Sequence, residues 1–559
     1  MEKQNMTKTK KRPFFKHYKK IFVNEFSGYS GSKLVKDILA GLTVAAVALP
    51  LALAFGAASV GAEFTAVGIC AGLITAIVSG IVTGLLGGGS FQISGPTGAM
   101  TVVLGAIVSG KYGLQGMFLA CLLAGIIMFI AGLLRFGKLI QFIPRPVVTG
   151  FTTGIAIVIA LGQLGNFFGV TLKGDTTIDK VIYFFKYSLG SISLPTVICS
   201  AAVVMFMIIY PKKLAKYVPA SLVSIILITI VTVAANIDIK QIGEIPATLI
   251  NSETLKIHKV TPGMISSVFG SAITIAALGM IESLLCGTCA ANMKKEKFDS
   301  NVELIAQGLG NIAVPFLGGV PSTAAIARTS VAVKAGGQTR LTSLFQSIFL
   351  IVCMFALSGI IGVVPYAALA GVLVMTAWNM NEWETIKYYF KNKLWDAVAM
   401  FLITMIVTVC LDLTYAIIIG VVVSLIIMVN KLSKMKIETS YFNHSNIDHH
   451  NSAIVYCTGA LFFANAKEIE KELASLKEGY DRIVIVMRGI VYLDISAVSQ
   501  LMEIIKDTES DGKKKIYFTG VRPEIMRTFE RCNFTEEIGE NSFYSSIDKF
   551  LLEVKETVE

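Results

Sequence analysis

Charged side chains are scarce in this chain of 559 residues. Asp, Glu, Lys and Arg make up 16% of it and 54% is hydrophobic, whereas soluble globular domains carry roughly 25% charged residues. The shortage excludes an ordinary soluble core for most of the length. It indicates a series of membrane spans, because each crossing of the hydrocarbon layer needs about 20 apolar residues.

Sequence motifs of enzymes are also missing. The chain has no phosphate-binding loop, no nucleophile elbow and no cluster of residues with metal-ligand spacing. We therefore expect no enzymatic activity, no cofactor and no metal. Most of the nine cysteines lie inside apolar runs, which argues against a secreted disulfide framework. The first apolar run lacks a small-residue cleavage signal, so we expect no removable signal peptide.

Long apolar runs fill most of the first 432 residues. We predict a transmembrane transport domain over 38–432, preceded by a basic arm (1–37) and followed by a polar linker (433–451). Two segments, 94–110 and 322–335, are too short and too rich in small residues to cross alone. Twelve complete spans bring the total to fourteen segments. They are predicted near 38–58, 66–86, 114–134, 146–168, 194–210, 218–236, 263–291, 302–316, 340–361, 365–379, 395–411 and 414–430.

The last part of the chain, 452–559, has a different character. It is charged, and short strand patterns alternate with helical ones. This alternation is typical of a small α/β domain. The predicted strands are Ala453–Cys457, Arg482–Met487 and Lys514–Phe518, and the predicted helices lie near 465–477, 496–508, 522–532 and 543–555.

Basic residues account for the net charge of +11. They gather in the arm and in alternate loops, at Arg135, Lys212, Lys294 and Lys387 among others, whereas the loop Gly359–Ala367 carries no charge. Cytoplasmic loops of membrane proteins show this excess. We therefore expect both termini, including the α/β domain, on the cytoplasmic side of the cell membrane, and no nucleic-acid partner.

The two short segments resemble each other. Gly87–Met100 and Phe316–Arg328 each have glycines, an extended stretch with one proline, and then small helix formers. Such broken segments in two halves of a transporter indicate inverted repeats with a binding site at the bilayer midplane. Each half-helix would direct its N-terminal partial positive charge at that site, which suits an anion. The alternative is a pair of ordinary glycine-rich surface loops.

Several long motifs resemble one known family. The family is that of the SulP anion permeases, the prokaryotic relatives of solute carrier family 26. The motif of its first span resembles Ala48–Phe55, and that of its third span resembles Gln92–Gly98. The motifs of its eighth and ninth spans resemble Leu278–Leu285 and Asn301–Asn311. The tail resembles a STAS domain. The resemblance implies two inverted repeats of seven segments, a core and a gate domain that move in an elevator-like manner, and a homodimer.

The resemblance also implies the site. For the substrate it implies a set of residues on segments 1, 3 and 10, and for the coupling ion two residues on segment 8. The substrate set is Phe55, Thr97, Gly98, Ala325, Ile326, Ala327 and Arg328, and the coupling pair is Glu282 and Cys286. Phe55 could instead be simple packing, and Thr97 a helix cap that touches no ligand.

Arg328 and Glu282 are charged groups placed inside spans, where they are costly and functional by default. Arg328 would draw anions in, or else form a structural pair with Glu282 or make a cytoplasmic contact. A buried carboxylate tends to bind a proton or a cation. Related bicarbonate carriers of the resembled family hold sodium with an Asp and a Thr where this chain has Glu282 and Cys286. Because a thiol is a poor ligand for a hard cation, proton coupling is favoured over sodium.

Three other features have a functional and a simpler interpretation. Ser496 in Leu493–Ala497 falls on the serine that is phosphorylated in anti-sigma-factor antagonists, but Asp494 or Ser496 could equally cap a helix. The Cys286-x-x-Cys289 pair lies in an apolar span and indicates small-residue packing. His444, His449 and His450 lie in the polar linker, where solvation is the simpler interpretation.

Proton-coupled symport of a small inorganic or carboxylate anion is therefore the leading hypothesis. Sulfate, bicarbonate and a dicarboxylate all suit a helix-end site. A sodium-coupled bicarbonate symporter, an anion channel, and a membrane-tethered signalling protein whose tail binds a regulatory partner are the competing hypotheses.

Overall fold

The computed structural model describes residues 22–23, 25–60, 64–137, 144–174, 177–211, 214, 218–243, 248–356, 358–411, 413–432, 434–442, 452–476, 480, 482–510 and 512–556. Most of the basic arm and the three linker histidines lie outside these residues. The chain divides into two compact units, 1–421 and 422–559.

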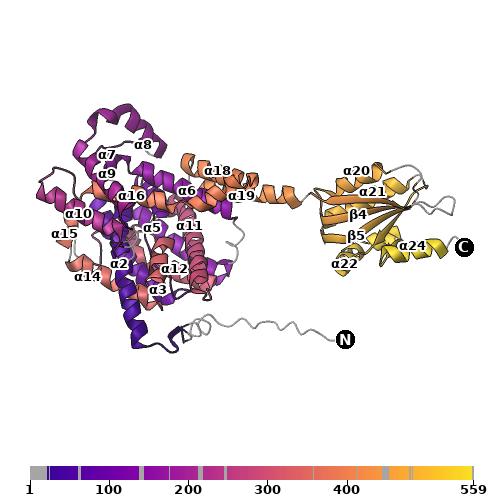
Figure 1. Ribbon diagram of the computed structural model, residues 1–559, viewed down its shortest axis with the longest axis horizontal. Helices are drawn as coiled ribbons and strands as arrows, with labels where there is room; N and C mark the ends of the chain where they lie inside the picture. Colours follow the sequence, from indigo (N-terminus) through magenta and orange to yellow (C-terminus); the bar gives the residue numbers. More distant parts are fainter. Residues whose placement is uncertain are drawn as a thin grey trace. The chain divides into compact units, whose positions relative to one another are not determined.

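The first unit is helical, and within the described residues each of the fourteen predicted segments has a helix of its own (Figure 1). The first seven are α2 (Gly31–Val60), α3 (Thr65–Leu86), α4 (Gly98–Val108), α5 (Gly113–Leu133), α6 (Arg145–Gly162), α9 (Leu194–Ile209) and α10 (Ala220–Ala234). The second seven are α11 (Pro262–Lys294), α12 (Ser300–Ala313), α13 (Ile326–Lys334), α14 (Leu341–Ala356), α16 (Tyr366–Met380), α18 (Trp395–Cys410) and α19 (Leu413–Leu432). Their grouping into two inverted repeats stays a prediction.

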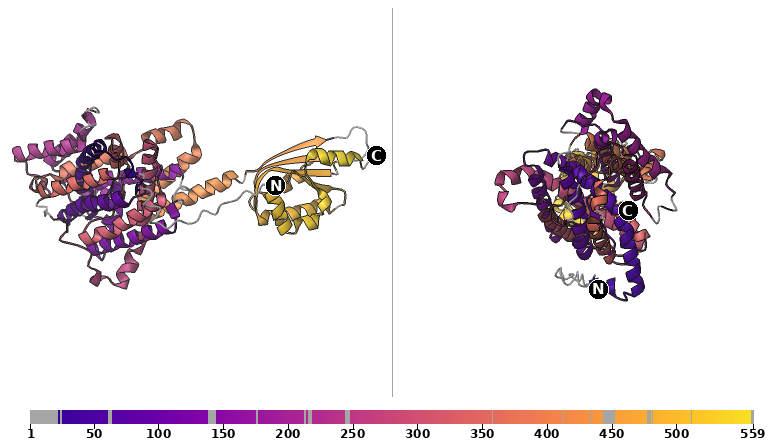
Figure 2. Two further views of the ribbon diagram at one scale, coloured as in Figure 1. Left: turned by 90° about the horizontal axis from the view of Figure 1, so that it is seen from below. Right: turned by 90° about the vertical axis from the view of Figure 1, so that its left-hand side faces the viewer.

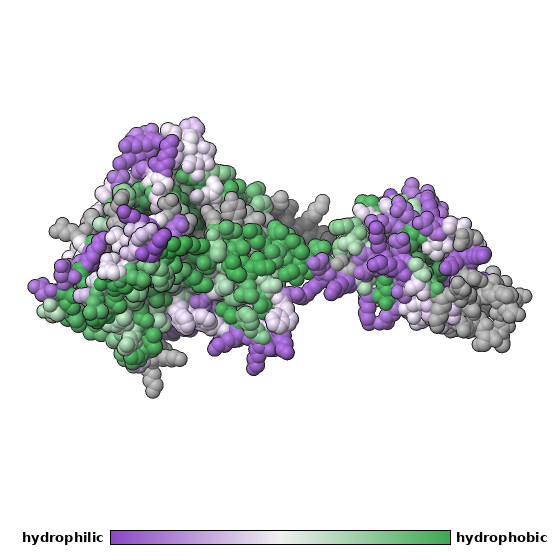
Figure 3. Space-filling view, turned by 90° about the horizontal axis from the view of Figure 1, so that it is seen from above, coloured by the Kyte–Doolittle hydropathy of each residue, from purple (hydrophilic) through white to green (hydrophobic). Residues whose placement is uncertain are grey.

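Helix lengths differ from the predicted spans. Within the described chain, five stretches are long and apolar enough to cross a membrane: α2, α3, α5, α11 and the stretch 145–168. Helices α9 and α18 have 16 residues each, about 24 Å at 1.5 Å per residue, and so need flanking chain to cross. On the face drawn in Figure 3, hydrophobic side chains cover the middle of this unit, as a lipid-facing surface requires.

Several predicted boundaries were wrong. The span 146–168 is interrupted at Gln163, where α6 ends and the short α7 begins. Helix α15 (Ser358–Gly362) belongs to the predicted span 340–361. The shorter elements that the sequence did not predict are α7 (Leu164–Phe168), α8 (Thr177–Tyr183), a π-helix (Phe184–Ser188), α17 (Trp383–Lys391) and 3-10 turns at Leu189–Ser191, Ile257–Lys259 and Val314–Leu317.

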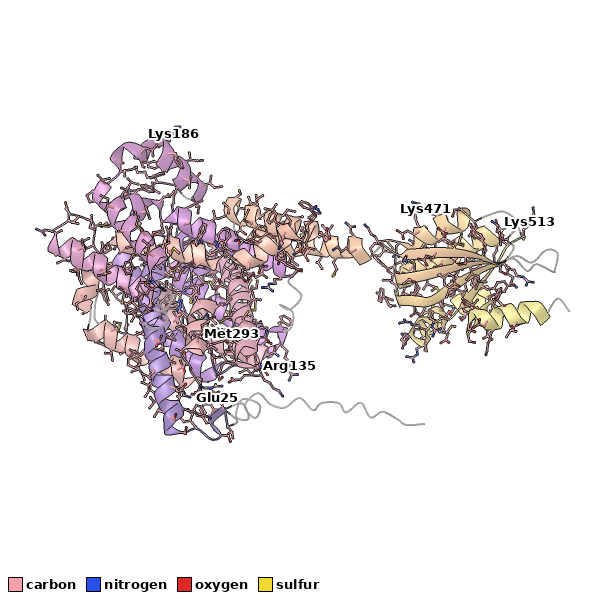
Figure 4. All side chains as sticks on the ribbon, in the orientation of Figure 1. Glu25, Arg135, Lys186, Met293, Lys471 and Lys513 are labelled. Atoms are coloured by element: carbon pink, nitrogen blue, oxygen red, sulfur yellow. The ribbon has the colours of Figure 1, made fainter. Side chains whose placement is uncertain are left out.

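Helix α2 begins inside the stretch predicted as an arm. Asp37 is fully buried, and its Oδ1 accepts hydrogen bonds from the backbone N–H of Gln338 (2.6 Å) and of Thr339 (3.0 Å). Just before α2, Glu25 (Figure 4) forms an ion pair of 2.7 Å with the buried Arg340. These contacts join the start of α2 to the loop before α14, so the helix extends further toward the N-terminus than hydropathy indicates.

Glycines allow close helix crossings in this unit. A Cβ at Gly80 would lie 2.3 Å from Ser347 Oγ, and one at Gly150 would lie 2.4 Å from the carbonyl oxygen of Phe401. The distance from a Cβ at Gly72 to the carbonyl oxygen of Ala52 would be 2.1 Å. At Gly72 and Gly150 the nearest atoms belong to the backbone, so only glycine fits at these two positions.

The second unit is a five-stranded sheet in the order β3-β4-β5-β6-β7. Strand β3 is antiparallel to β4, and the other neighbours are parallel. The strands are β3 (Lys436–Phe442), β4 (Ser452–Leu461), β5 (Arg482–Leu493), β6 (Lys515–Thr519) and β7 (Phe543–Tyr544), and the helices are α20 (Ala466–Ala474), α21 (Ile495–Glu509), α22 (Pro523–Arg531), α23 (Phe534–Ile538) and α24 (Ile547–Glu556).

The side chains of β5 point alternately to the two faces of the sheet, so this unit has two hydrophobic cores. Helices lie on both faces (Figure 2). Ile483 and Ile485 pack with α20 to α23, whereas Val484 packs with Phe550 of α24, as the period of two requires. Two predictions were wrong here. Strand β3 occupies part of the predicted linker, and β7 occupies the start of a predicted helix. Their partners β4 and β6 supply the hydrogen bonds that local sequence does not reveal.

Candidate functional site

The two broken segments meet in the interior of the first unit. Strand β1 (Ser94–Gly95) pairs antiparallel with β2 (Thr323–Ala324), so that Ser94 lies opposite Ala324 and Gly95 opposite Thr323. All four residues are buried. Helix α4 begins three residues after β1, and α13 begins two residues after β2. The strand pair therefore brings the N-termini of both half-helices together, which excludes the interpretation as two surface loops.

Neither of these N-termini is capped by a side chain. The cap residues Thr97 and Ala325 both have extended backbone, and neither makes a side-chain cap hydrogen bond. The first-turn N–H groups of a helix have no partner within the helix. Two sets of such donors, each at the positive end of a helix dipole, can accept a negative charge.

Arg328 adds a full positive charge to this place. It is 1% exposed, and its Nη2 donates a hydrogen bond to the carbonyl oxygen of Pro96, in the turn between β1 and α4. Its Nε and Nη1 are buried and have no hydrogen-bond partner among the described residues. Buried donors of a cation are costly when they are left unpaired, so a group with acceptor atoms beside these two nitrogens would relieve that cost.

Glu282 lies beside the tip of α4. Its Oε2 accepts a hydrogen bond of 3.0 Å from the hydroxyl of Thr97. Among the described residues, no ion pair within 4.0 Å joins Glu282 and Arg328. The structure therefore does not support the simpler interpretation, in which Arg328 is a direct partner of this carboxylate.

Cys286 is placed differently from the substrate residues. The buried thiol donates to the hydroxyl of Thr329 at 3.2 Å, in the first turns of α13, and that hydroxyl accepts from the N–H of Ile93 at 3.0 Å. The thiol thus links α11 to α13 next to the strand pair. Cys289 is exposed, so the two thiols have different surroundings.

Phe55 covers the tip of α4. A Cβ at Gly98 would lie 3.1 Å from its Cε1 and 2.3 Å from Cδ1 of Ile159. A larger residue at the first position of α4 would therefore displace the end of the Ile159 side chain. Phe55 and Ile159 also line a cavity of about 790 Å³, together with Thr101, Lys240, Tyr366 and others. These two apolar side chains lie between the cavity and the helix tip.

The predicted set is thus only partly brought together. Phe55, Thr97, Gly98 and Arg328 meet at the tips, with Glu282 bound to Thr97. Ile326 and Ala327 are exposed, and neither lines the cavity. Ala325 is half-buried at the cap of α13.

Sequence reasoning missed a second layer of polar residues behind the tips. Ser283 Oγ and Thr323 Oγ1 are hydrogen-bonded at 2.8 Å, and Ser283 accepts from the N–H of Ala324 at 3.2 Å. Helix α12 adds Glu303 and Gln307, both fully buried. The spacing of four between polar residues in an otherwise apolar segment was the signal that could have found the α12 pair.

In the second unit, Asp494 is the N-cap of α21, because its Oδ1 accepts from the N–H of Ala497 at 2.7 Å. Ser496 is exposed in the first turn of that helix. The capping role therefore belongs to Asp494, and the modification of Ser496 stays a prediction. Among the described residues, no group of three or more His, Cys, Asp and Glu could hold a metal ion.

Comparisons with known proteins agree with this architecture. A 29% identical relative, covering 94% of this chain and 99% of its own length, is named "Putative sulfate transporter YvdB" of Bacillus subtilis (strain 168). Bicarbonate transporter BicA of Picosynechococcus is 28% identical, with coverage of 90% and 91%.

Solved structures share the fold. The murine Slc26a9 anion transporter in its inward-facing state superposes with a TM-score of 0.84 at 18% identity, covering 99% of this chain and 97% of that one. The transmembrane domain of a cyanobacterial BicA gives 0.62 at 26% identity, covering 71% and 98%. The profile of the STAS domain matches residues 444–550, and that of the sulfate permease family matches 34–404. The chain therefore belongs to the sulfate permease family and ends in a STAS domain.

Proposed function

We propose that this permease is a secondary active transporter that binds a small anion between the tips of α4 and α13. One observation carries the proposal. Nε and Nη1 of the buried Arg328 have no partner among the described residues, and they lie where two uncapped helix N-termini meet. An anion there would accept hydrogen bonds from the guanidinium and from backbone N–H groups, offsetting the desolvation of the buried charge.

Glu282 is the coupling group in this proposal. Thr97, the cap of α4, donates to it directly, so the protonation state of Glu282 bears on the position of the anion-binding tip. When Glu282 is protonated and the anion is bound, the core that moves would carry less net charge through the membrane. Sodium is less well served, because the thiol of Cys286 donates to Thr329 and offers a soft atom in place of an oxygen.

The substrate class follows from the site and from the relatives. Sulfate, bicarbonate and small dicarboxylates each carry charge and acceptor oxygens that suit Arg328 and the helix ends. Relatives named for sulfate and for bicarbonate support the first two. An elevator-like movement of a core against a gate, a homodimer, and a cytoplasmic STAS domain at the cell membrane complete the proposal.

The test is uptake of labelled anions into proteoliposomes. Sulfate, bicarbonate and a dicarboxylate are compared at two pH values, with and without sodium. We expect uptake driven by an inward proton gradient, loss of uptake in Arg328→Gln, and loss of pH dependence in Glu282→Gln. Glu282→Gln with unchanged pH dependence would refute the coupling role, and uptake that requires sodium would favour the sodium symporter.

The same assay separates a carrier from a channel and from a signalling protein. A channel would pass anions far faster than a carrier and would not concentrate them, and a signalling protein would move none. Thermal unfolding of each purified variant in detergent distinguishes a folded transporter that fails to bind from a misfolded one.

A further inference from the structure

One face of α12 carries three polar side chains in a buried position. Glu303, Gln307 and Asn311 are spaced by four residues, so they lie in a row along the helix. Their exposed fractions are 0%, 0% and 1%. Buried polar groups of this kind are retained when each makes specific hydrogen bonds. None of the side chains that form the anion site belongs to this row.

The row contacts the chain on its way into β1. Glu303 Oε2 accepts from the backbone N–H of Gly88 at 2.9 Å, and its Oε1 accepts from Gln307 Nε2 at 2.9 Å. The same Nε2 donates to the hydroxyl oxygen of Ser94 at 2.7 Å. Glu303 and Gln307 thus hold the glycine-rich approach to β1 and β1 itself.

Asn311 makes the corresponding contact with the other segment. Its Oδ1 accepts from the N–H of Ser322 at 2.8 Å, and its Nδ2 donates to the carbonyl oxygen of Ser322 at 2.9 Å. Ser322 directly precedes β2. One helix face therefore holds both strands, and each strand pairs with the other through only two residues.

The direction of these hydrogen bonds fits an ionised Glu303. Gln307 presents its NH2 group to Glu303 and to Ser94, which is the orientation that an ionised carboxylate requires, because it only accepts. Its Oε1 is then left buried and without a partner among the described residues. A buried acceptor left unpaired costs free energy. The hydrogen bond to Glu303 therefore holds the amide in this orientation despite that cost.

We propose that Gln307, oriented by Glu303, is a positioning residue that sets the approach of the two helix tips and thereby the affinity and selectivity for the anion. The uptake measurements that test this inference rest on the proposed function, whereas the hydrogen-exchange measurements do not. The strand pair is too short to fix its own register, because two residue pairs supply few hydrogen bonds. The row on α12 supplies part of the missing constraint, together with Ser283 of α11, which is hydrogen-bonded to Thr323 and Ala324.

A polarity swap tests the inference. Gln307→Glu places two carboxylates in contact and removes the donor to Ser94. Glu303→Gln combined with Gln307→Glu restores one donor and one acceptor at every contact. In that double variant the amide at position 303 accepts from Gly88 and donates to the carboxylate at position 307, which in turn accepts from the hydroxyl of Ser94. Gln307→Met, which has similar volume and no amide, is the second variant should Gln307→Glu fail to fold.

The control variant is Gln346→Glu. Gln346 is fully buried on α14, and its amide has no hydrogen-bond partner among the described residues. The change buries a carboxylate in the same unit, on a helix other than α12. It is expected to lower the yield of folded protein and to leave KM and anion selectivity unchanged.

Uptake kinetics and hydrogen exchange of the peptide covering 92–98 are measured for each variant. We expect Gln307→Glu or Gln307→Met to raise KM about tenfold, the factor that ~1.4 kcal/mol represents, to alter the ratio of uptake between small and large anions, and to speed exchange in 92–98. The double variant should return all three to within about twofold of the wild type.

Unchanged KM and exchange in both single variants would overturn the inference. So would a double variant that stays as impaired as Gln307→Glu, or an equal rise of KM in Gln346→Glu. Wild-type protein that moves no anion would refute the proposed function alone, because the exchange measurements still decide whether α12 positions β1.

Discussion

Gly95→Ala is the sharpest perturbation of the anion site, because it removes no charge and no hydrogen-bonding group. A Cβ at Gly95 would lie 2.2 Å from Arg328 Nη1 and 3.3 Å from its Cζ, whereas ordinary van der Waals contact begins at 3.4 Å. The methyl group would also meet backbone, since the Cα of Ala76 lies 3.4 Å away. The guanidinium must therefore move by about 1 Å, or β1 must shift.

The magnitude follows from what that movement disrupts. Hydrogen bonds to charged groups contribute about 1.5–3 kcal/mol each. Losing one such bond between Arg328 and the anion weakens binding about ten- to hundredfold, at ~1.4 kcal/mol per factor of ten. Overpacking of a close contact adds about 1–3 kcal/mol of destabilisation, which is measured separately by thermal unfolding.

The assay is anion uptake into proteoliposomes over a range of anion concentrations, with Gly270→Ala as the control. Gly270 lies in α11, the helix of Glu282, and a Cβ there has nothing within 4 Å. Gly95→Ala is expected to raise KM strongly, and Gly270→Ala to leave it unchanged. A folded Gly95→Ala protein with the wild-type KM would refute the placement of the anion against Arg328.

Three further predictions concern stability and reactivity. Arg340→Ala leaves Glu25 without its ion-pair partner, so the free energy of unfolding in detergent should fall by about 3–5 kcal/mol. Asp494→Ala removes the cap of α21, at a cost of about 1 kcal/mol, and should speed hydrogen exchange at Ala497 in the full chain. Burial raises the pKa of Cys457 to about 12, so maleimide should label it only after unfolding, and stability should decline above pH ~9, where the unfolded thiol ionises first.

Hydropathy predicted the segment plan well because it depends on local composition. Each apolar stretch became a helix, and the glycines and prolines at 87–100 and 316–328 marked the two breaks. Because hydropathy is local, it predicted the boundaries of the elements less accurately. Asp37 reads as the charged end of an arm, but its partners lie at residues 338 and 339. Strand β3 was assigned to the linker because its pairing with β4 does not show in its own sequence.

The candidate site divides in the same way. The residue types that suit an anion, Arg328 and Glu282 in apolar spans, could be picked out from the sequence because charge in a membrane is costly wherever it occurs. Their positions and hydrogen bonds in the folded protein could not be predicted in this way. Nothing local predicts that Arg328 donates to Pro96, or that Thr97 bonds to Glu282 and leaves α4 uncapped.

By itself, the sequence determined a polytopic membrane protein with two interrupted segments, the family that this pattern resembles, and a separate α/β domain. These properties follow from the hydropathy, chain-breaking residues and motifs of continuous stretches. Only the tertiary structure decided that β1 pairs with β2, that Arg328 keeps two donors without a partner among the described residues beside the helix tips, and that one face of α12 holds both strands. The strand pair and the contacts of Arg328 and Gln307 join residues more than two hundred positions apart, for which local propensity carries no information.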